Sequence, residues 1–158
     1  MRVRPATPDD APAILDLHVA SIRAFGPAAY DERQVEAWAT TDGPPDYPIG
    51  EPGQYLVVAE REGELAGFGH LHVPEAEVRA VYVHPGHARR GVGSALLGRL
   101  EAEARGRGID ELSLSASRNA VPFYEALGWE RVREASHETS GGVVLPVVVM
   151  RRSLDGEV

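Results

Sequence analysis

Residues 81–97, VYVHPGHARRGVGSALL, contain in one unbroken run a short strand, a glycine-bearing loop and the first turns of a helix. Val81 to Val83 is β-branched and aromatic, as strands are, and Pro85-Gly86 ends it. From Ser94 onward the apolar residues follow helical spacing, which predicts a helix N-terminus at Arg89 to Ser94. The first backbone N–H groups of a helix have no partner inside it, so this loop is a candidate anion-binding site.

The residues of the loop favour a phosphate as the anion. Gly91 and Gly93 remove side chains that would hold a phosphate away from the helix, and Arg89 and Arg90 add positive charge. A Walker loop is excluded because the chain has no lysine, and a dinucleotide fingerprint is excluded because its third glycine is replaced by Leu96. The alternative interpretation is that Gly91 and Gly93 only let a helix pack closely on a strand.

Bulk properties restrict the class of protein. With 158 residues, 43% of them hydrophobic, we expect one domain over residues 1–158 with a sizeable core. The absence of cysteine excludes disulfides, thiolate zinc sites and cysteine nucleophiles. The N-terminus lacks a signal core and no apolar run approaches the roughly 20 residues of a membrane span, so a cytoplasmic protein is expected. The net charge of -8 argues against nucleic acid and membrane partners and favours an amine-bearing substrate, although GC-rich coding or a salty cytoplasm would give the same charge.

The rest of the chain predicts strands and helices without repeats or linkers. Thr7 caps a helix that runs to about Phe25, with a buried stripe of Ile14, Leu17, His18 and Ile22. Residues 41–53 are rich in Pro, Gly and Asp and predict a long loop. Strands are expected over residues 3–6, 54–60, 65–73, 77–84, 112–116, 131–137 and 143–151, and further helices over residues 31–38, 93–105 and 121–127.

A second motif lies downstream in SASRNAVPFYEALGW, residues 115–129. Together the two motifs resemble the GNAT (GCN5-related) N-acetyltransferases, in which a strand, Arg/Gln-x-x-Gly-x-Gly/Ala and a helix form the acetyl-CoA motif. Gly91 and Gly93 match its glycines, whereas Ala88 stands where the family has Arg or Gln. The resemblance covers residues 2 to about 152. It implies an α/β (α+β) GNAT fold, with a mixed, mostly antiparallel central sheet of about seven strands that splays at the acetyl-CoA site, and about four helices.

The resemblance also implies acetyl-CoA as the acyl donor, with no metal. Where the sheet splays, backbone N–H and C=O groups lose their partners, and pantetheine amides replace them. Ser117 stands where the family often has asparagine, so either Ser117 or Asn119 is expected to bond pantetheine. The residues implied in cofactor binding are Val81, Tyr82 and Val83 by their main chain, Arg89, Arg90, Gly91, Val92, Gly93 and Ser94 at the diphosphate, and Ser117, Asn119 and Tyr124.

The reaction implied is direct transfer of acetyl to a primary amine of a small molecule or peptide in a ternary complex. An alkyl ammonium has a pKa near ~10.4, so it must lose a proton before it attacks. Glu77 is the candidate base: strand alternation places it on the face of Arg79, Val81 and Val83, and the resemblance implies this role because some members of the family have a glutamate base there. His70, His72 and a water chain are the alternatives.

Tyr124 resembles the family's tyrosine that meets the sulfur of CoA. Full proton transfer from a phenol to a thiolate is uphill by roughly 2 kcal/mol in water, so a hydrogen bond is its expected contribution. Two other functions stay open: a non-catalytic acetyl-CoA-binding module, and a protein that binds another phosphate ligand at the glycine loop. The sequence does not identify the acceptor, for which Tyr30, Trp38 and Tyr47 are candidate lining residues, and it is compatible with a homodimer.

Overall fold

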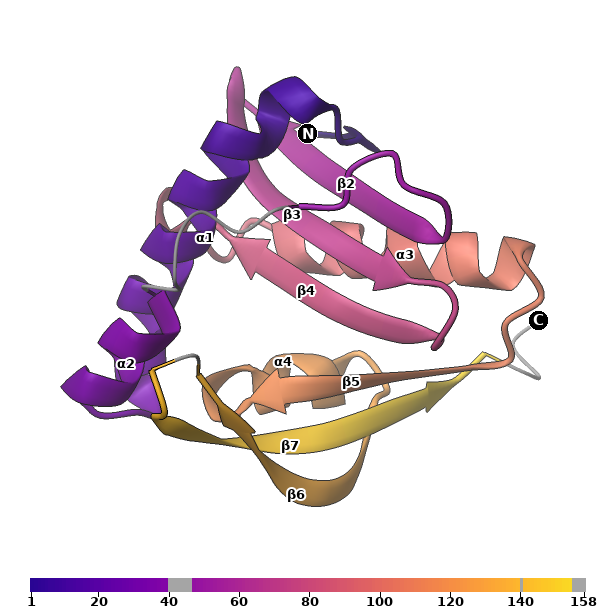
Figure 1. Cartoon of the computed structure of the whole chain (residues 1–158). Coiled ribbons are helices and arrows are strands. Elements are labelled where there is room, and N and C mark those ends of the chain that lie inside the picture. Colours follow the sequence, from indigo (N-terminus) through magenta and orange to yellow (C-terminus); the bar gives the residue numbers. More distant parts are fainter. Residues whose placement is uncertain (40–46, 140, 155–158) are drawn as a thin grey trace.

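The computed structural model describes residues 1–39, 47–139 and 141–154, which form a sheet covered by helices (Figure 1). The strands follow the order β1-β2-β3-β4-β5-β7-β6. Neighbouring strands are antiparallel except for β4 and β5, which run parallel, so the predicted mixed, mostly antiparallel sheet of seven strands is confirmed. Their bounds are β1 (Arg2–Pro5), β2 (Gln54–Arg61), β3 (Glu64–His72), β4 (Glu77–Val83), β5 (Glu111–Ser117), β6 (Glu130–Glu138) and β7 (Val144–Ser153).

Helices cover both faces of the sheet. They are α1 (Ala11–Phe25), α2 (Glu32–Ala39), α3 (Val92–Gly106) and α4 (Val121–Ala126). Successive residues of a strand point to opposite faces, and Val58 of β2 packs with Leu17 of α1 while Val57 packs with Leu96 of α3. Within the described part of the chain, no helix has the length and apolar character needed to cross a membrane.

Local sequence signals explain where the elements begin and end. Thr7 precedes a short 3-10 turn that leads into α1, and the Thr7 N–H donates a hydrogen bond to the Asp10 carboxylate at 2.7 Å. The stripe predicted for α1 is largely confirmed, since Ile14, Leu17 and Ile22 are buried and His18 is half-buried. Of the loop predicted at residues 41–53, residues 41–46 lie outside the described residues, and residues 47–53 contain no helix or strand.

The sheet opens between β4 and β5. These two strands share one residue pair, Glu77 opposite Ser113, and the Ser113 N–H donates to the Ala76 carbonyl at 3.0 Å. Beyond this pair the strands separate toward their C-terminal ends, as Figure 1 shows. On its other side β5 pairs with β7 along its whole length. The edge of β4 that faces β5 therefore lacks a neighbouring strand over most of its length.

A β-bulge interrupts β4 at Arg79. Val78 lies opposite Leu71 of β3 and Ala80 lies opposite His70, so Arg79 is an additional residue with no partner of its own. A bulge shifts the alternation of side chains between the two faces by one residue. The side chains before Arg79 and those after it therefore alternate between the two faces of the sheet in opposite phase.

The bulge separates Glu77 from the residues that strand alternation predicted to share its face. Val78 packs in the same cluster as Val81 and Val83, on the α3 side of the sheet. Glu77 consequently lies on the opposite face, the face of Tyr82, which packs toward α1. The prediction that Glu77 shares a face with Val81 and Val83 is wrong, because alternation counted along the sequence does not include a bulge.

Candidate active site

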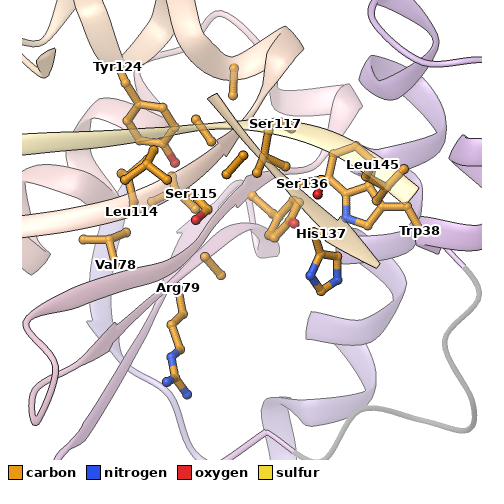
Figure 2. A pocket seen from close by; sticks show the side chains of 18 of the residues that line it. Trp38, Val78, Arg79, Leu114, Ser115, Ser117, Tyr124, Ser136, His137 and Leu145 are labelled. Carbon is orange, nitrogen blue, oxygen red and sulfur yellow. The ribbon is translucent and has the colours of Figure 1, made fainter. Parts of the chain in front are cut away.

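A cavity of about 520 Å³ occupies the opening between β4 and β5. We call it the β4–β5 cavity; β4 and β5 supply residues 78–82 and 114–117, and the α1–α2 segment, α4, β6 and β7 complete its wall (Figure 2). A second cavity of about 460 Å³, the α1–α4 cleft, lies between α1, the N-terminus of α3 and α4. The two adjoin, because both are lined by Trp38, Val81, Tyr82, Ser117 and Ala120.

The main chain of β4 presents hydrogen-bonding groups to this opening. The His84 N–H donates to the Ala66 carbonyl of β3 at 2.8 Å, and alternate residues of a strand turn their N–H and C=O to the same neighbour. Tyr82 therefore faces β3 through its main chain, whereas Val81 and Val83 face the opening. Of the three residues predicted to bind through their main chain, Val81 and Val83 are oriented for it, and Tyr82 contributes its side chain to the wall.

The glycine loop forms the N-terminus of α3. Gly91 is the N-cap residue with φ 78°, a left-handed conformation that glycine adopts without strain, and Arg89 has φ 60°. The first intrahelical bond runs from the Ala95 N–H to the Gly91 carbonyl at 3.0 Å. The N–H groups of Val92, Gly93 and Ser94 accordingly lie in the first turn, where an anion is favoured.

The predicted loop residues differ in their exposure. Arg89 and Gly93 line the α1–α4 cleft, Arg90, Gly91 and Ser94 are exposed, and Val92 is buried. A Cβ at Gly93 would lie 3.1 Å from the Phe123 ring and 3.5 Å from Val83 Cγ2. Close packing therefore accounts for glycine at position 93, whereas the left-handed backbone accounts for Gly91.

Tyr124 of α4 supplies a hydroxyl to the β4–β5 cavity. Its side chain is 6% exposed, its ring packs edge-on against Trp129 at 5.8 Å, and Figure 2 shows its hydroxyl pointing into the cavity. Burial raises the pKa of this phenol far above its usual range, so the hydroxyl keeps its proton and is a hydrogen-bond donor at neutral pH.

Asn119 carries a buried polar atom that lacks a partner. Within the described residues, no donor reaches the side-chain oxygen of Asn119, which lines the α1–α4 cleft. A buried acceptor without a donor is costly in free energy, and a ligand N–H in the cleft would satisfy it. Ser117, the other candidate, lines both the cleft and the cavity.

The three candidate bases do not line either cavity. Glu77 accepts a hydrogen bond at 2.8 Å from Arg79, which does line the β4–β5 cavity. His70 and His72 bond the two ends of the Gln54 amide, each at 2.7 Å. The sequence predicted a shared face for the two histidines, and the structure places both beside Gln54 rather than in the opening.

Several lining residues were not predicted from the sequence. They include Ser115 of β5 and Arg133, Ser136 and His137 of β6. β6 is an edge strand whose residues are mostly exposed, so its own pattern does not mark them. Only the pairing of β6 with β7, which follows β5 in the sheet, brings them to the cavity.

The aromatic residues expected near the acceptor are divided between two places. Tyr30 and Trp38 line the β4–β5 cavity, and the Tyr30 hydroxyl donates to the Pro146 carbonyl at 2.6 Å and accepts from the Arg118 N–H at 2.9 Å. Tyr47 instead packs against Phe68 and bonds His18 at 3.0 Å, away from the cavity wall. Two of the three candidate lining residues are thus in the cavity.

Two histidines, His18 and His70, make stability depend on pH. Burial lowers the pKa of His18 and His70 to about 4. The unfolded chain takes up protons below pH ~6.5 that the folded chain does not, so the unfolding free energy falls as the pH drops from 6.5 toward 4. We expect urea unfolding at pH 5 to show a loss of roughly 2 kcal/mol per histidine relative to pH 7. His70→Gln should remove the loss that is due to His70; a pH dependence in this variant equal to that of the wild type would contradict the assignment.

The chain belongs to the Acetyltransferase (GNAT) family, which it matches over residues 15–129. This match confirms the resemblance drawn from the glycine loop and from the motif that contains Tyr124. A mycothiol acetyltransferase from Kineococcus radiotolerans is 34% identical over an alignment of 139 residues, and the match covers 83% of this chain and 43% of that protein. The chain spans less than half the length of the mycothiol acetyltransferases that it matches.

Solved structures of acetyltransferases share the architecture. A GCN5-related N-acetyltransferase from Rhodopseudomonas palustris has a TM-score of 0.85 and 30% identity, covering 97% of this chain and 95% of that one. The PaiA N-acetyltransferase from Thermoplasma acidophilum, solved in complex with coenzyme A, has a TM-score of 0.72 over 96% of this chain and 98% of its own, at 19% identity. The second likeness is one of fold alone.

Proposed function

We propose that this chain transfers the acetyl group of acetyl-CoA to a primary amine of a small molecule or peptide, by direct attack in a ternary complex. One observation carries the proposal: an anion-favouring helix N-terminus, an unpaired strand edge and the Tyr124 hydroxyl surround two adjoining cavities. The coenzyme A complex of the Thermoplasma relative supports a CoA ligand for this fold. A non-catalytic binding module is not favoured, because Tyr124 directs a protonated hydroxyl into the cavity.

The described residues offer separate contacts to the successive parts of acetyl-CoA. The first turn of α3, with Arg89 and Arg90 beside it, holds the diphosphate, and the main chain of Val81 and Val83 bonds the pantetheine amides. Asn119 accepts a pantetheine N–H at its otherwise unpartnered oxygen. When bound, acetyl-CoA supplies an activated acyl group at the β4–β5 cavity; the protein orients it and handles the protons.

Proton removal from the amine requires a base close to the β4–β5 cavity. Glu77 does not line the cavity, but its carboxylate bonds Arg79, which does. We therefore propose that Glu77 accepts the proton through an intervening water. His137, which lines the cavity from β6, is the alternative base.

The diphosphate assignment is tested by placing a negative charge in the first turn of α3. Ser94 is exposed, and aspartate near a helix N-terminus stabilises the helix, so Ser94→Asp leaves the fold intact. Repulsion between like charges should weaken acetyl-CoA binding by about tenfold or more. The measurement is titration calorimetry with acetyl-CoA and with acetyl-pantetheine, which lacks the diphosphate.

The matched control for this experiment is Ala102→Asp, which adds the same charge at an exposed position farther along α3. Wild-type affinity of Ala102→Asp for acetyl-CoA, and unchanged binding of acetyl-pantetheine by Ser94→Asp, are expected. If Ser94→Asp binds acetyl-CoA like the wild type, the diphosphate lies elsewhere and the proposed cofactor site is wrong.

A further inference from the structure

The charged side chains around the β4–β5 cavity are basic, although the chain as a whole carries a net charge of -8. Among the described residues that line the cavity, the charged or titratable groups other than tyrosine are Arg79, Arg133 and His137, with no Asp or Glu. The acidic bulk composition therefore does not describe the environment of the reacting amine. The charged side chains that the acceptor meets on the wall itself are basic, and the carboxylates of Glu75 and Glu77 lie behind Arg79.

The two arginines are not equivalent. Arg79 is already balanced by carboxylates, with Glu77 at 2.8 Å and Glu75 at 3.5 Å, and Figure 2 shows its side chain extending away from Tyr124. The guanidinium of Arg133 has neither an ion pair nor a hydrogen bond to any other described residue, whereas the nearby Arg131 pairs with Glu125 at 3.3 Å. Arg133 thus offers the cavity a guanidinium whose donors are available for a ligand.

Apolar side chains surround Arg133 on the same wall. Arg133 lies opposite Val149 in the β6–β7 pairing, and Ala135 and Val147 form the next pair along the wall. Trp38 and Tyr82 also line the cavity. A ligand that fills this space buries an apolar body and places one polar end at Arg133.

We infer that the acceptor is an amino carboxylic acid with an apolar side chain, whose carboxylate pairs with Arg133 while its amine faces the acetyl group. This inference rests on the proposed function and names the substrate class of the same site. A guanidinium binds a carboxylate through two parallel hydrogen bonds, and one free guanidinium balances one negative charge. Acceptors with several ammonium groups, such as polyamines and aminoglycosides, find no carboxylate on the described wall and are disfavoured.

The test compares acceptors that differ only in the carboxylate. Phenylalanine with 2-phenylethylamine, and leucine with 3-methylbutylamine, are assayed by CoA release with the whole chain and acetyl-CoA. For each acceptor the ratio of kcat/KM between Arg133→Gln and the wild type is taken, because this ratio does not depend on the amine's own pKa. Arg131→Gln, on the same strand but outside the cavity wall, is the matched control.

We expect Arg133→Gln to lower kcat/KM for the amino acids by about tenfold to a hundredfold, the range of one charge-assisted hydrogen bond, and for the decarboxylated amines by less than about twofold. Arg131→Gln should change neither. Equal losses for both acceptors, faster acetylation of spermidine or an aminoglycoside, or acetylation of no member of the panel would overturn the inference. The proposed function is judged independently, by acetyl-CoA binding in Ser94→Asp and by acetylation of peptide N-termini.

Discussion

Tyr124→Phe is expected to lower the maximal rate of acetyl transfer by roughly a hundredfold while acetyl-CoA affinity stays close to that of the wild type. The substitution keeps the ring and its packing against Trp129, and removes only the hydroxyl that points into the β4–β5 cavity. This hydroxyl remains protonated at neutral pH, so its contribution is a hydrogen bond to the departing thiolate, where charge develops in the transition state. Steady-state kinetics with saturating acceptor measure the effect.

The leaving group provides a check on this role. A thiolate of lower basicity than that of CoA leaves more readily and needs less stabilisation by a hydrogen bond. The loss of maximal rate in Tyr124→Phe should therefore be smaller with an acetyl thioester of a more acidic thiol. Tyr55→Phe is the matched control, because the Tyr55 hydroxyl accepts a hydrogen bond from Arg99 outside both cavities. Equal defects with both donors, or a higher acceptor KM at an unchanged maximal rate, would place Tyr124 outside the chemical step.

Glu77→Gln is expected to lower turnover by about a hundredfold at neutral pH and to recover part of the loss at high pH. The amide keeps the size of the carboxylate but cannot accept the proton, and at high pH the free amine no longer needs a base. A pH profile of kcat/KM from pH 6 to 10 measures this recovery. Glu75→Gln is the matched control, since Glu75 also pairs with Arg79 but lies farther from it, at 3.5 Å.

Two results of that experiment would reassign the base. A Glu77→Gln profile that overlays the wild type would remove Glu77 from the reaction. A loss in His137→Gln that disappears at high pH would then identify His137, which lines the cavity directly. Losses of equal size in Glu75→Gln and Glu77→Gln would show that the carboxylates act only by neutralising Arg79.

The elements of the fold follow from local signals, which is why the sequence predicted them well. Alternation marks the strands, Thr7 marks the start of the first helical turns, and the glycine-bearing loop before the helical spacing marks the start of α3. These features depend on residues within one or two turns of each other. The position of Tyr124 on α4 was predictable for the same reason.

The missed features depend on contacts between distant segments. The bulge at Arg79 exists only in the pairing of β4 with β3, so alternation alone placed Glu77 on the wrong face. Arg133 reaches the β4–β5 cavity because β6 pairs with β7 rather than with β5, an order that no local pattern encodes. The net charge of the chain likewise did not predict which charged residues line the β4–β5 cavity, because it sums over the whole molecule.

The single residue pair between β4 and β5 also affects the cohesion of the protein. On one side of the opening, β1 to β4 are joined by antiparallel ladders, and on the other side β5, β7 and β6 form a ladder of their own. Side-chain bonds such as that of Tyr30 to Pro146 connect the helical segment to the second ladder. A ligand bonded to the free edge of β4 and to Asn119 would join the two ladders where the main chain does not. The acyl donor would then be a structural member of the sheet as well as a reactant, and its departure after each turnover would return the protein to two less firmly joined parts.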